Sequence, residues 1–197
     1  MAVVRRESCA KIGGMDQFVA GKLLVASPKL NDPNFARTVV YIGMHDANGA
    51  FGLVLNRMLA LDVSDHLDGW AVAVGAPAVV FKGGPMEPSA VLGLATPLDE
   101  PGPGWSEMAG GAGLIDLSLP ASETARRLAG LRIFLGYSGW GAGQLEDEIR
   151  NEGWFVVSME VGDLFTPEPA RLWQRVLRRQ PGKLAMFAYF PDDPTRN

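Results

Sequence analysis

One stretch of this 197-residue chain is more informative than any other: Leu131-Arg132-Ile133-Phe134-Leu135-Gly136-Tyr137-Ser138-Gly139-Trp140-Gly141-Ala142-Gly143-Gln144-Leu145-Glu146. Its first five residues are mostly apolar and predict a strand. A helical pattern follows over 144–151, with Leu145 and Ile149 on one face. The glycine-rich residues between them, 136–143, predict a turn that places backbone amides at the start of a helix. We therefore expect this turn to form either a close packing contact or a binding surface.

Strand and turn signals dominate the residues that precede this stretch. Residues 21–26 are a short apolar run, and residues 37–44 and 50–55 are two longer runs with β-branched and aromatic side chains. Asn48-Gly49 between the two longer runs predicts an antiparallel hairpin over 37–55, because both residue types tolerate positive φ. Further strands are expected at 79–81, 90–96 and 114–119, with a surface loop over 100–113.

Helices and strands are mixed in the rest of the chain. Helices are expected from Pro120 to Gly130 and from Thr166 to Arg179, since proline favours a helix start and glycine a helix end. Leu172, Trp173, Val176 and Leu177 form the apolar stripe of the second of these helices. Strands are expected at 154–159 and 184–190. The pattern predicts an α+β fold with a largely antiparallel sheet, in one domain over residues 18–197 after a polar lead-in at 1–17.

Charge and composition exclude several classes of protein. The formal net charge is −4, which disfavours a general nucleic-acid binder. No apolar run is long enough to span a membrane, and the lead-in has no apolar core typical of a secretory signal. Cys9 is the single cysteine, so the chain cannot form an internal disulfide. We therefore expect a cytoplasmic protein that does not contact a membrane.

Catalytic and cofactor motifs are incomplete. Gly136-x-Ser138 begins a nucleophile-elbow pattern, but Trp140 stands where that pattern requires glycine. The same glycines match neither G-x-G-x-x-G nor a P-loop, and the acidic residues after Gln144 would repel a phosphate. The two histidines, His45 and His66, lack the spacing of metal ligands. We predict no catalytic residue, no metal and no cofactor.

The helix expected to end at Arg179 carries a second feature, a basic face. Its arginines are Arg171, Arg175, Arg178 and Arg179. The spacing of the first three places them on one side, away from the apolar stripe. A solvated helix face is the interpretation we favour. A surface for nucleic acid or an acidic partner is the alternative.

Four ordered blocks resemble the YqgE/AlgH family of bacterial proteins. They are Leu23-Leu24-Val25-Ala26-Ser27-Pro28 with Asp32-Pro33-Asn34-Phe35-Ala36-Arg37-Thr38-Val39-Val40-Tyr41-Ile42, then Gly52-Leu53-Val54-Leu55-Asn56-Arg57, then Gly83-Gly84-Pro85, and finally the glycine-rich residues 136–146. The resemblance covers about residues 18–190. The ending Tyr189-Phe190-Pro191-Asp192-Asp193-Pro194 is similar to actinobacterial members.

The resemblance implies a bifurcated, barrel-like β-sheet packed by three or four helices, in a cytoplasmic protein. It implies no established activity, and the AlgH name reflects a proposed regulatory role in alginate synthesis. The chain departs from the family at Tyr41-Ile42-Gly43-Met44-His45, where many relatives have Tyr-Ile-Cys-x-His. A redox role of that cysteine is therefore not carried over. The family position of Ser138 is often alanine, which argues further against a serine nucleophile.

A shared binding surface is the prediction that follows from these blocks, because they are turn-rich and carry polar and aromatic groups. We expect them to converge in space. The candidate residues are Asn31, Asp32, Pro33, Phe35, Arg37, Asn56, Arg57, Gly83, Gly84, Pro85, Tyr137, Gly139, Trp140, Gly141, Gln144 and Glu146.

Three functions are compatible with such a surface. The first is a non-enzymatic binding protein or one linked to transcription regulation, and an unidentified protein is its expected partner. The second is an enzyme of unrecognised type that uses Asn56, Arg57, Glu146 or His45 around a pocket near Trp140. The third is a transcription-linked protein that contacts nucleic acid through the arginine face. The sequence names neither a ligand nor an oligomeric state.

Overall fold

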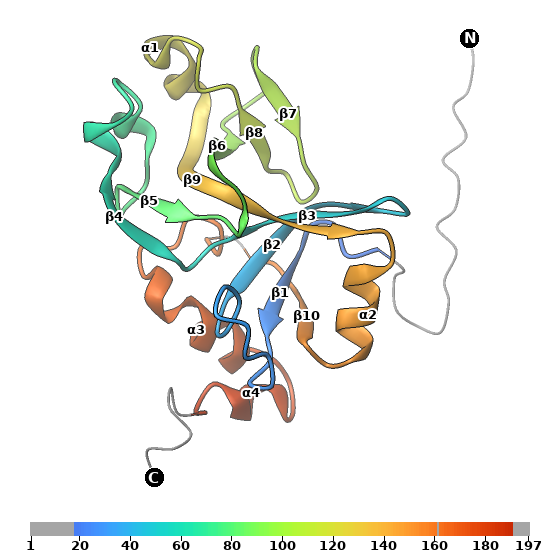
Figure 1. Ribbon diagram of the computed structural model, residues 1–197. Coiled ribbons are helices and arrows are strands. Elements are labelled where there is room, and N and C mark those ends of the chain that lie inside the picture. Colours follow the sequence, from blue (N-terminus) through green and yellow to red (C-terminus); the bar gives the residue numbers. More distant parts are fainter. Residues whose placement is uncertain (1–17, 161, 191–197) are drawn as a thin grey trace.

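The structure is a computed structural model that describes residues 18–160 and 162–190 (Figure 1). The expected lead-in at 1–17, Cys9 and the end at 191–194 lie outside the described residues. The described strands are β1 (Lys22–Ala26), β2 (Val39–Asp46), β3 (Gly49–Val54), β4 (Met58–Asp62), β5 (Val79–Lys82), β6 (Met86–Pro97), β7 (Trp105–Glu107), β8 (Gly113–Ile115), β9 (Leu128–Gly141) and β10 (Trp154–Ser158). The α-helices are α1 (Ala121–Thr124), α2 (Gln144–Arg150), α3 (Leu172–Arg178) and α4 (Leu184–Phe187).

All strands join in one sheet of order β10-β1-β2-β3-β9-β6-β8-β7, to which β5 and β4 are attached through β9. The pairs of neighbouring strands are antiparallel, except β5 with β9. The prediction of an α+β fold with a largely antiparallel sheet is confirmed. Within the described residues, no helix is both long and apolar enough to cross a membrane.

Strand β9 is the centre of the sheet and the place where it divides. One edge of β9 pairs with β6 along most of its length. The opposite edge pairs first with β5, at Phe134 and Leu135, and then with β3, from Ser138 to Gly141. Gly136 lies between these two partners with a φ of 66°. The sheet therefore splits into two parts and curls into a half-barrel, and Figure 1 shows β9 passing from one part to the other.

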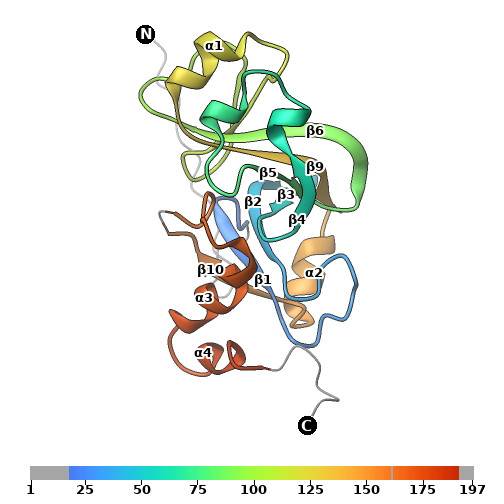
Figure 2. The same ribbon diagram turned by 90° about the vertical axis from the view of Figure 1, so that its left-hand side faces the viewer.

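The strands β1, β2 and β3 are covered on both faces. Helix α3 packs on one face, where Leu172 and Val176 join a core with Leu23 and Tyr41. Helix α2 and the segment before β2 cover the other face, over a core that contains Trp140. Figure 2 shows α2 and α3 on opposite sides of these strands. Burial on both faces explains why these strands read as continuous apolar runs rather than alternating ones.

The predicted hairpin over 37–55 is confirmed, although Gly49 belongs to β3 rather than to the turn. Asp46 pairs with Gly49, so Ala47 and Asn48 make a two-residue turn between β2 and β3. The predicted stripe on the helix that ends near Arg179 is also confirmed, because its four residues are at most 3% exposed. In these segments, local turn chemistry and hydrophobic period agree with the final packing.

Two predictions about the type of structure are wrong. Residues 184–190 were expected to be a strand, but they begin with helix α4, in which Phe187 stacks on Phe155 at a ring distance of 5.2 Å. The expected turn over 136–143 is mostly strand, since β9 continues to Gly141. Gly139 and Gly141 pair with Phe51 and Gly49, and this pairing keeps the glycines extended.

Other predictions are wrong in extent. The helix expected from Pro120 to Gly130 is limited to α1 and a 3-10 turn over Ala125–Arg127, because β9 already begins at Leu128. Strand β7 lies inside the expected 100–113 loop, and the strand expected over 114–119 covers only 113–115. Strand β4 was not predicted.

Candidate functional site

Gly83 bridges the two parts of the sheet at the point where it divides. Its N–H donates to the Leu135 carbonyl at 2.8 Å, and its carbonyl accepts from the Val54 N–H at 2.9 Å. A Cβ added to Gly83 would lie 2.2 Å from the Gly136 carbonyl oxygen, and one added to Gly84 would lie 2.2 Å from that of Tyr137. Both glycines are needed because the backbones cross too closely for a side chain.

Asn56 and Arg57 hold the segment 31–37 against the sheet. The Asn56 carboxamide accepts from the Val39 N–H at 3.0 Å and donates to the Arg37 carbonyl at 2.9 Å. The Arg57 guanidinium donates to the Ala36 carbonyl at 2.6 Å. These side chains satisfy backbone groups that have no strand partner, so their role is to fix the fold locally.

The same segment is tied at two further points. The Lys82 ammonium donates to the Asn34 side-chain oxygen at 3.0 Å. Arg37 donates to the Phe190 carbonyl at 2.6 Å, and its guanidinium lies 4.6 Å from the centroid of the Trp173 ring. Arg37 has a φ of 57°, which is unusual for a residue with a side chain. The segment therefore connects β5 with the C-terminal helices.

Trp140 packs inside an aromatic cluster rather than beside an open pocket. It is 6% exposed, and its ring lies 6.1 Å from that of Phe35 and 6.2 Å from that of Trp154. Both indole N–H groups donate to one oxygen of Glu148, at 2.9 and 2.8 Å. Gln144 donates to the other oxygen at 3.0 Å. This cluster attaches α2 to β9.

His45 and Glu146 face each other between β2 and α2. The His45 Nε2 lies 3.4 Å from the Glu146 Oε1, and the His45 Nδ1 accepts from the Val19 N–H at 3.1 Å. The His45 side chain is fully buried. Both ring nitrogens therefore face protein groups, and the imidazole has no open side for a substrate. Sequence reasoning named both residues but could not predict that they meet.

An exposed apolar surface lies where four strands run side by side. Met44 on β2 pairs with Phe51 on β3, and Phe51 pairs with Gly139 on β9. Met86 on β6 pairs with Tyr137, which lies on the same face of β9 as Gly139. We call these five residues the methionine rim. Met44 is 52% exposed and Met86 is 46% exposed.

Tyr137 connects the methionine rim to the start of β6. Its ring lies 5.1 Å from that of Phe51, and its hydroxyl donates to Glu87 at 3.0 Å. This hydrogen bond is the main reason why the pKa of Tyr137 is raised. Glu87 has a φ of 41°. Sequence reasoning missed Met44, Phe51 and Met86, because only strand register places them beside Tyr137.

The predicted blocks meet around the division of the sheet, but their residues differ in burial and in what they contact. Asn56, Arg57, Gly83, Gly84 and Trp140 make or fill internal contacts. Phe35, Arg37, Tyr137 and Glu146 are half-buried. The exposed members are Asn31, Asp32, Pro33, Pro85, Gly139, Gly141 and Gln144. Asp32 accepts from the Asn34 N–H at 2.8 Å, and Gln144 accepts from that of Gly141 at 3.1 Å.

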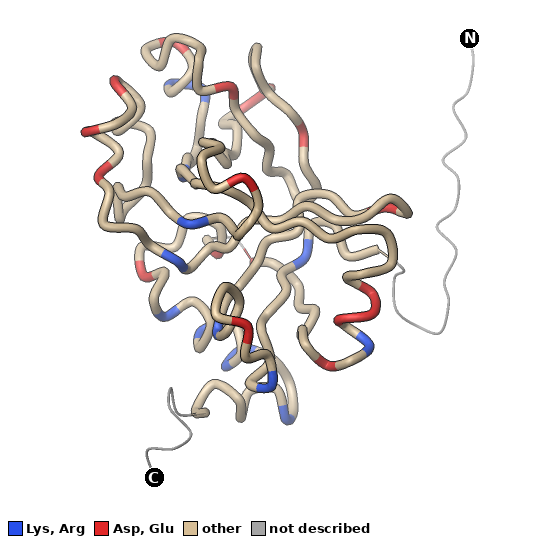
Figure 3. Tube along the Cα trace, viewed as in Figure 1, with Lys and Arg blue, Asp and Glu red and all other residues tan. Residues whose placement is uncertain are grey.

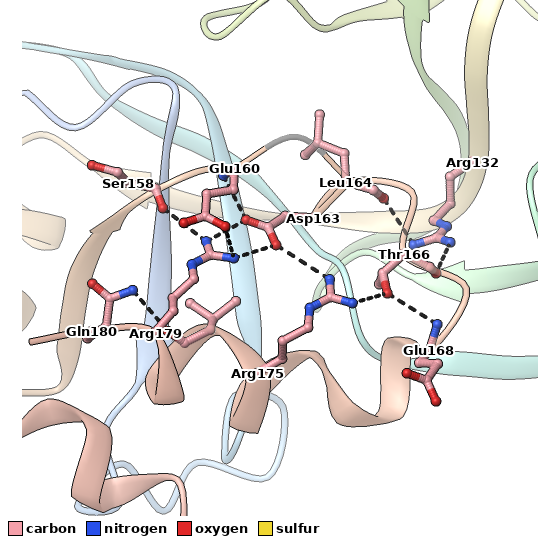
Figure 4. A network of polar contacts seen from close by, with 11 residues as sticks. Arg132, Ser158, Glu160, Asp163, Leu164, Thr166, Glu168, Arg175, Arg179 and Gln180 are labelled. Carbon is pink, nitrogen blue, oxygen red and sulfur yellow. Dashed lines mark hydrogen bonds and ion pairs between the residues drawn. The ribbon is translucent and has the colours of Figure 1, made fainter.

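Part of the predicted arginine face is used inside the protein (Figure 4). Asp163 is 1% exposed and accepts two hydrogen bonds from Arg179, at 2.8 and 2.6 Å. Arg175 donates to Thr166 at 2.8 Å and lies 3.4 Å from Asp163. The hydrogen bond with Asp163 is the main cause of the raised pKa of Arg179. Only Arg171 and Arg178 of this face are largely exposed.

Arg132 is a buried cation that sequence reasoning did not single out. It donates to the carbonyls of Leu164 and Thr166 at 3.0 and 2.8 Å. Its guanidinium lies 4.4 Å from the centroid of the Phe81 ring, and burial lowers its pKa to about 10. Among the described residues, no group of three or more His, Cys, Asp or Glu side chains is placed to hold a metal ion.

The fold and these contacts define an α+β protein built on one divided, curled sheet with an exposed rim at the division. A model of the AlgH-like family matches residues 23–185. The chain belongs to this family.

Relatives and solved structures agree with this assignment. A UPF0301 protein of Streptomyces avermitilis is 50% identical over 184 residues, covering 91% of this chain and 95% of the relative. One of Thermobifida fusca is 44% identical over 190 residues, covering 91% and 96%. A crystal structure from Corynebacterium diphtheriae superposes with a TM-score of 0.81 at 28% identity, covering 87% and 92%. The solution structure of the AlgH protein from Pseudomonas aeruginosa gives 0.66 at 27% identity, covering 93% and 100%.

Proposed function

We propose that the protein is a non-enzymatic binding protein and that a partner protein docks on the methionine rim. The observation that carries this proposal is the exposure of Met44 and Met86, 52% and 46%, on either side of the bare backbone of Gly139. Methionine side chains are flexible and polarisable, and they are common on surfaces that adapt to a partner. Contiguous exposed apolar groups are a feature of interaction sites.

The register gives the rim a definite size. Its residues lie on four neighbouring strands, β2, β3, β9 and β6, so the row spans roughly 14 Å at ~4.8 Å for each strand interval. Within the row, Phe51 and Tyr137 are the two members that pack against the core. Gly139 contributes no side chain, and the Tyr137 ring and the Met86 side chain lie beside its backbone, 3.5 and 3.7 Å from where a Cβ would stand.

Charge around the rim indicates the chemistry of the partner. Asp46 lies two residues after Met44 and Glu87 follows Met86, and both are exposed. Figure 3 also shows acidic positions on α2, but α2 covers the opposite face of the sheet from the rim. Electrostatic complementarity favours a partner with matching opposite charge. We therefore propose an apolar protein segment flanked by lysine or arginine.

The enzyme alternative has less support. His45 is enclosed, and the polar groups of Asn56 and Arg57 bind backbone groups of the protein itself. Nucleic-acid binding through the arginine face also has less support, because Asp163 already binds Arg175 and Arg179. A regulatory role linked to transcription, in the cytoplasm, is compatible with the proposal if the protein acts through a protein partner rather than through DNA.

Crosslinked capture from host lysate tests the proposal, with three forms of the protein compared. The rim variant carries Met44→Ser and Met86→Ser. The matched control carries Met58→Ser and Met186→Ser, which change two exposed methionines elsewhere. A captured protein is then purified and its Kd is measured with each form.

We expect a partner to bind wild type and the control equally and the rim variant at least tenfold more weakly. Binding should also weaken with added salt, since the proposed flanks are basic. A partner whose affinity is the same for the rim variant, or whose binding follows Met58 and Met186, would show that the rim is not the docking surface.

A further inference from the structure

A cavity of about 270 Å³ lies at the end of β6 that is remote from the methionine rim. Met86 begins this strand at the rim, and Pro97 ends it at the cavity. The walls are mainly apolar and come from β7, β8, α1 and the start of β9. The residues that matter for the argument are Trp105, Ile115, Leu119, Leu128, Glu123 and Arg127.

The indole of Trp105 forms a fixed wall with an unused hydrogen-bond donor. A Cβ added to Gly113 would lie 2.4 Å from the Trp105 Cζ2, so the ring lies directly on that backbone. The indole N–H groups of the four other tryptophans each donate to an acceptor in the protein. Within residues 18–160 and 162–190, no acceptor is recorded for the indole N–H of Trp105.

Two opposite charges stand at the cavity with no partner in the described part of the chain. A Cβ added to Gly102 would lie 3.0 Å from the Arg127 Nη1, so the guanidinium lies along the cavity wall. Glu123 is four residues earlier. This spacing often allows an ion pair on a regular helix. Here α1 ends at Thr124 and a 3-10 turn begins at Ala125, and the described residues show no ion pair between Glu123 and Arg127.

We propose that this cavity binds a free α-amino acid with an apolar side chain. The side chain enters between Trp105, Ile115 and Leu128. The carboxylate pairs with Arg127, and the ammonium group pairs with Glu123. A volume of about 270 Å³ lies just below the usual range of ligand pockets, so the ligand is small. The proposal is independent of the methionine rim.

The charge pattern favours one class of ligand, even though the Glu123 and Arg127 side chains are both exposed. An anionic ligand would pair with Arg127 but would place a like charge near Glu123. A cationic ligand would pair with Glu123 but would place a like charge near Arg127. A zwitterion pairs with both residues, and charged hydrogen bonds are the stronger ones. The mainly apolar walls favour an apolar side chain, because a buried polar group without a partner is costly.

Titration with L-leucine and L-phenylalanine tests the proposal. Binding is monitored by the chemical shifts of backbone amides in NMR spectra and by tryptophan fluorescence. Two leucine analogues serve as ligand controls, 4-methylpentanoate without the amine and 3-methylbutylamine without the carboxylate. Arg127→Gln and Glu123→Gln remove one charge each, and Arg126→Gln is the matched control because Arg126 does not line the cavity.

We expect leucine or phenylalanine to bind with a Kd near or below ~1 mM and to shift amides around Trp105. Arg127→Gln and Glu123→Gln should each weaken binding about tenfold, while Arg126→Gln should leave it unchanged. Both analogues should bind more weakly than leucine. Absence of amide shifts up to about 10 mM ligand, or equal affinity for leucine and 4-methylpentanoate, would overturn the proposal.

Discussion

The hydroxyl of Ser138 donates to the carbonyl of Gly83 at 3.1 Å, between two residues that lie 55 positions apart. Ser138 is fully buried, and the same carbonyl also accepts the Val54 N–H. The bond therefore links β9, β3 and the end of β5 at the place where the sheet divides. A serine in this position stabilises the junction and is not available as a nucleophile.

Replacement of Ser138 by alanine should therefore lower stability only slightly. The Gly83 carbonyl keeps its bond from Val54, so we expect a loss of about 1 kcal/mol in the free energy of unfolding. Urea unfolding of wild type and Ser138→Ala measures this difference. A collapse of the fold would mean that the hydroxyl does more than donate one bond.

Replacement of Gly84 by alanine should be far more damaging. The added Cβ would lie 2.2 Å from the Tyr137 carbonyl oxygen, and two backbones have to move apart to relieve the contact. We expect a loss of at least ~3 kcal/mol or failure to fold. Gly75→Ala is the control, because nothing lies within 4 Å of its added Cβ. Equal stability of the two variants would contradict the crossing geometry.

Asp163 should be the acidic residue on which stability depends most. Asparagine at this position leaves Arg179 and Arg175 without their buried counter-charge, and we expect a loss of about 3 kcal/mol. Asp147→Asn removes an exposed ion pair with Arg150 and should cost below ~0.5 kcal/mol. Chemical denaturation at neutral pH compares the two. Similar losses would mean that burial does not strengthen the Asp163 interactions.

Tyr41 should limit stability at alkaline pH. It is fully buried, its hydroxyl donates to the Ala109 carbonyl, and burial raises its pKa from 10.0 to about 12. Because the folded state holds this proton more tightly than the unfolded state, the contribution is complete below pH 10 and is lost as the pH rises to about 12. A shift of two units corresponds to roughly 3 kcal/mol at most.

Unfolding midpoints measured in urea from pH 8 to pH 12 test this prediction. Tyr41→Phe should be less stable than wild type at neutral pH because it lacks the hydrogen bond, but its stability should fall less steeply above pH 10. Parallel curves for both proteins would show that Tyr41 does not titrate during alkaline unfolding.

The candidate site was only partly predictable, as Gly83 and Trp140 illustrate. The glycine pair at 83–84 is visible in the sequence, but the reason for it is not. A Cβ on either glycine would lie 2.2 Å from the carbonyl oxygen of Gly136 or Tyr137, and these residues are far along the chain. The enzyme hypothesis places Trp140 beside a pocket, whereas its ring packs against Phe35 and Trp154, as a close packing contact of the glycine-rich stretch requires. Sequence distance hides both contacts.

The sequence by itself determined the features that depend on local physics. The hairpin turn before Gly49, the apolar stripe from Leu172 to Leu177 and the α+β class follow from turn chemistry and hydrophobic period. Tertiary structure alone decided that β9 continues through its glycines, that residues 184–187 are helical, and that Met44 and Met86 lie on one surface. Strand register between distant segments decides the course of β9 and the placement of the two methionines, where a one-residue shift would turn each side chain to the other face. The helix at 184–187 instead packs Phe187 against Phe155.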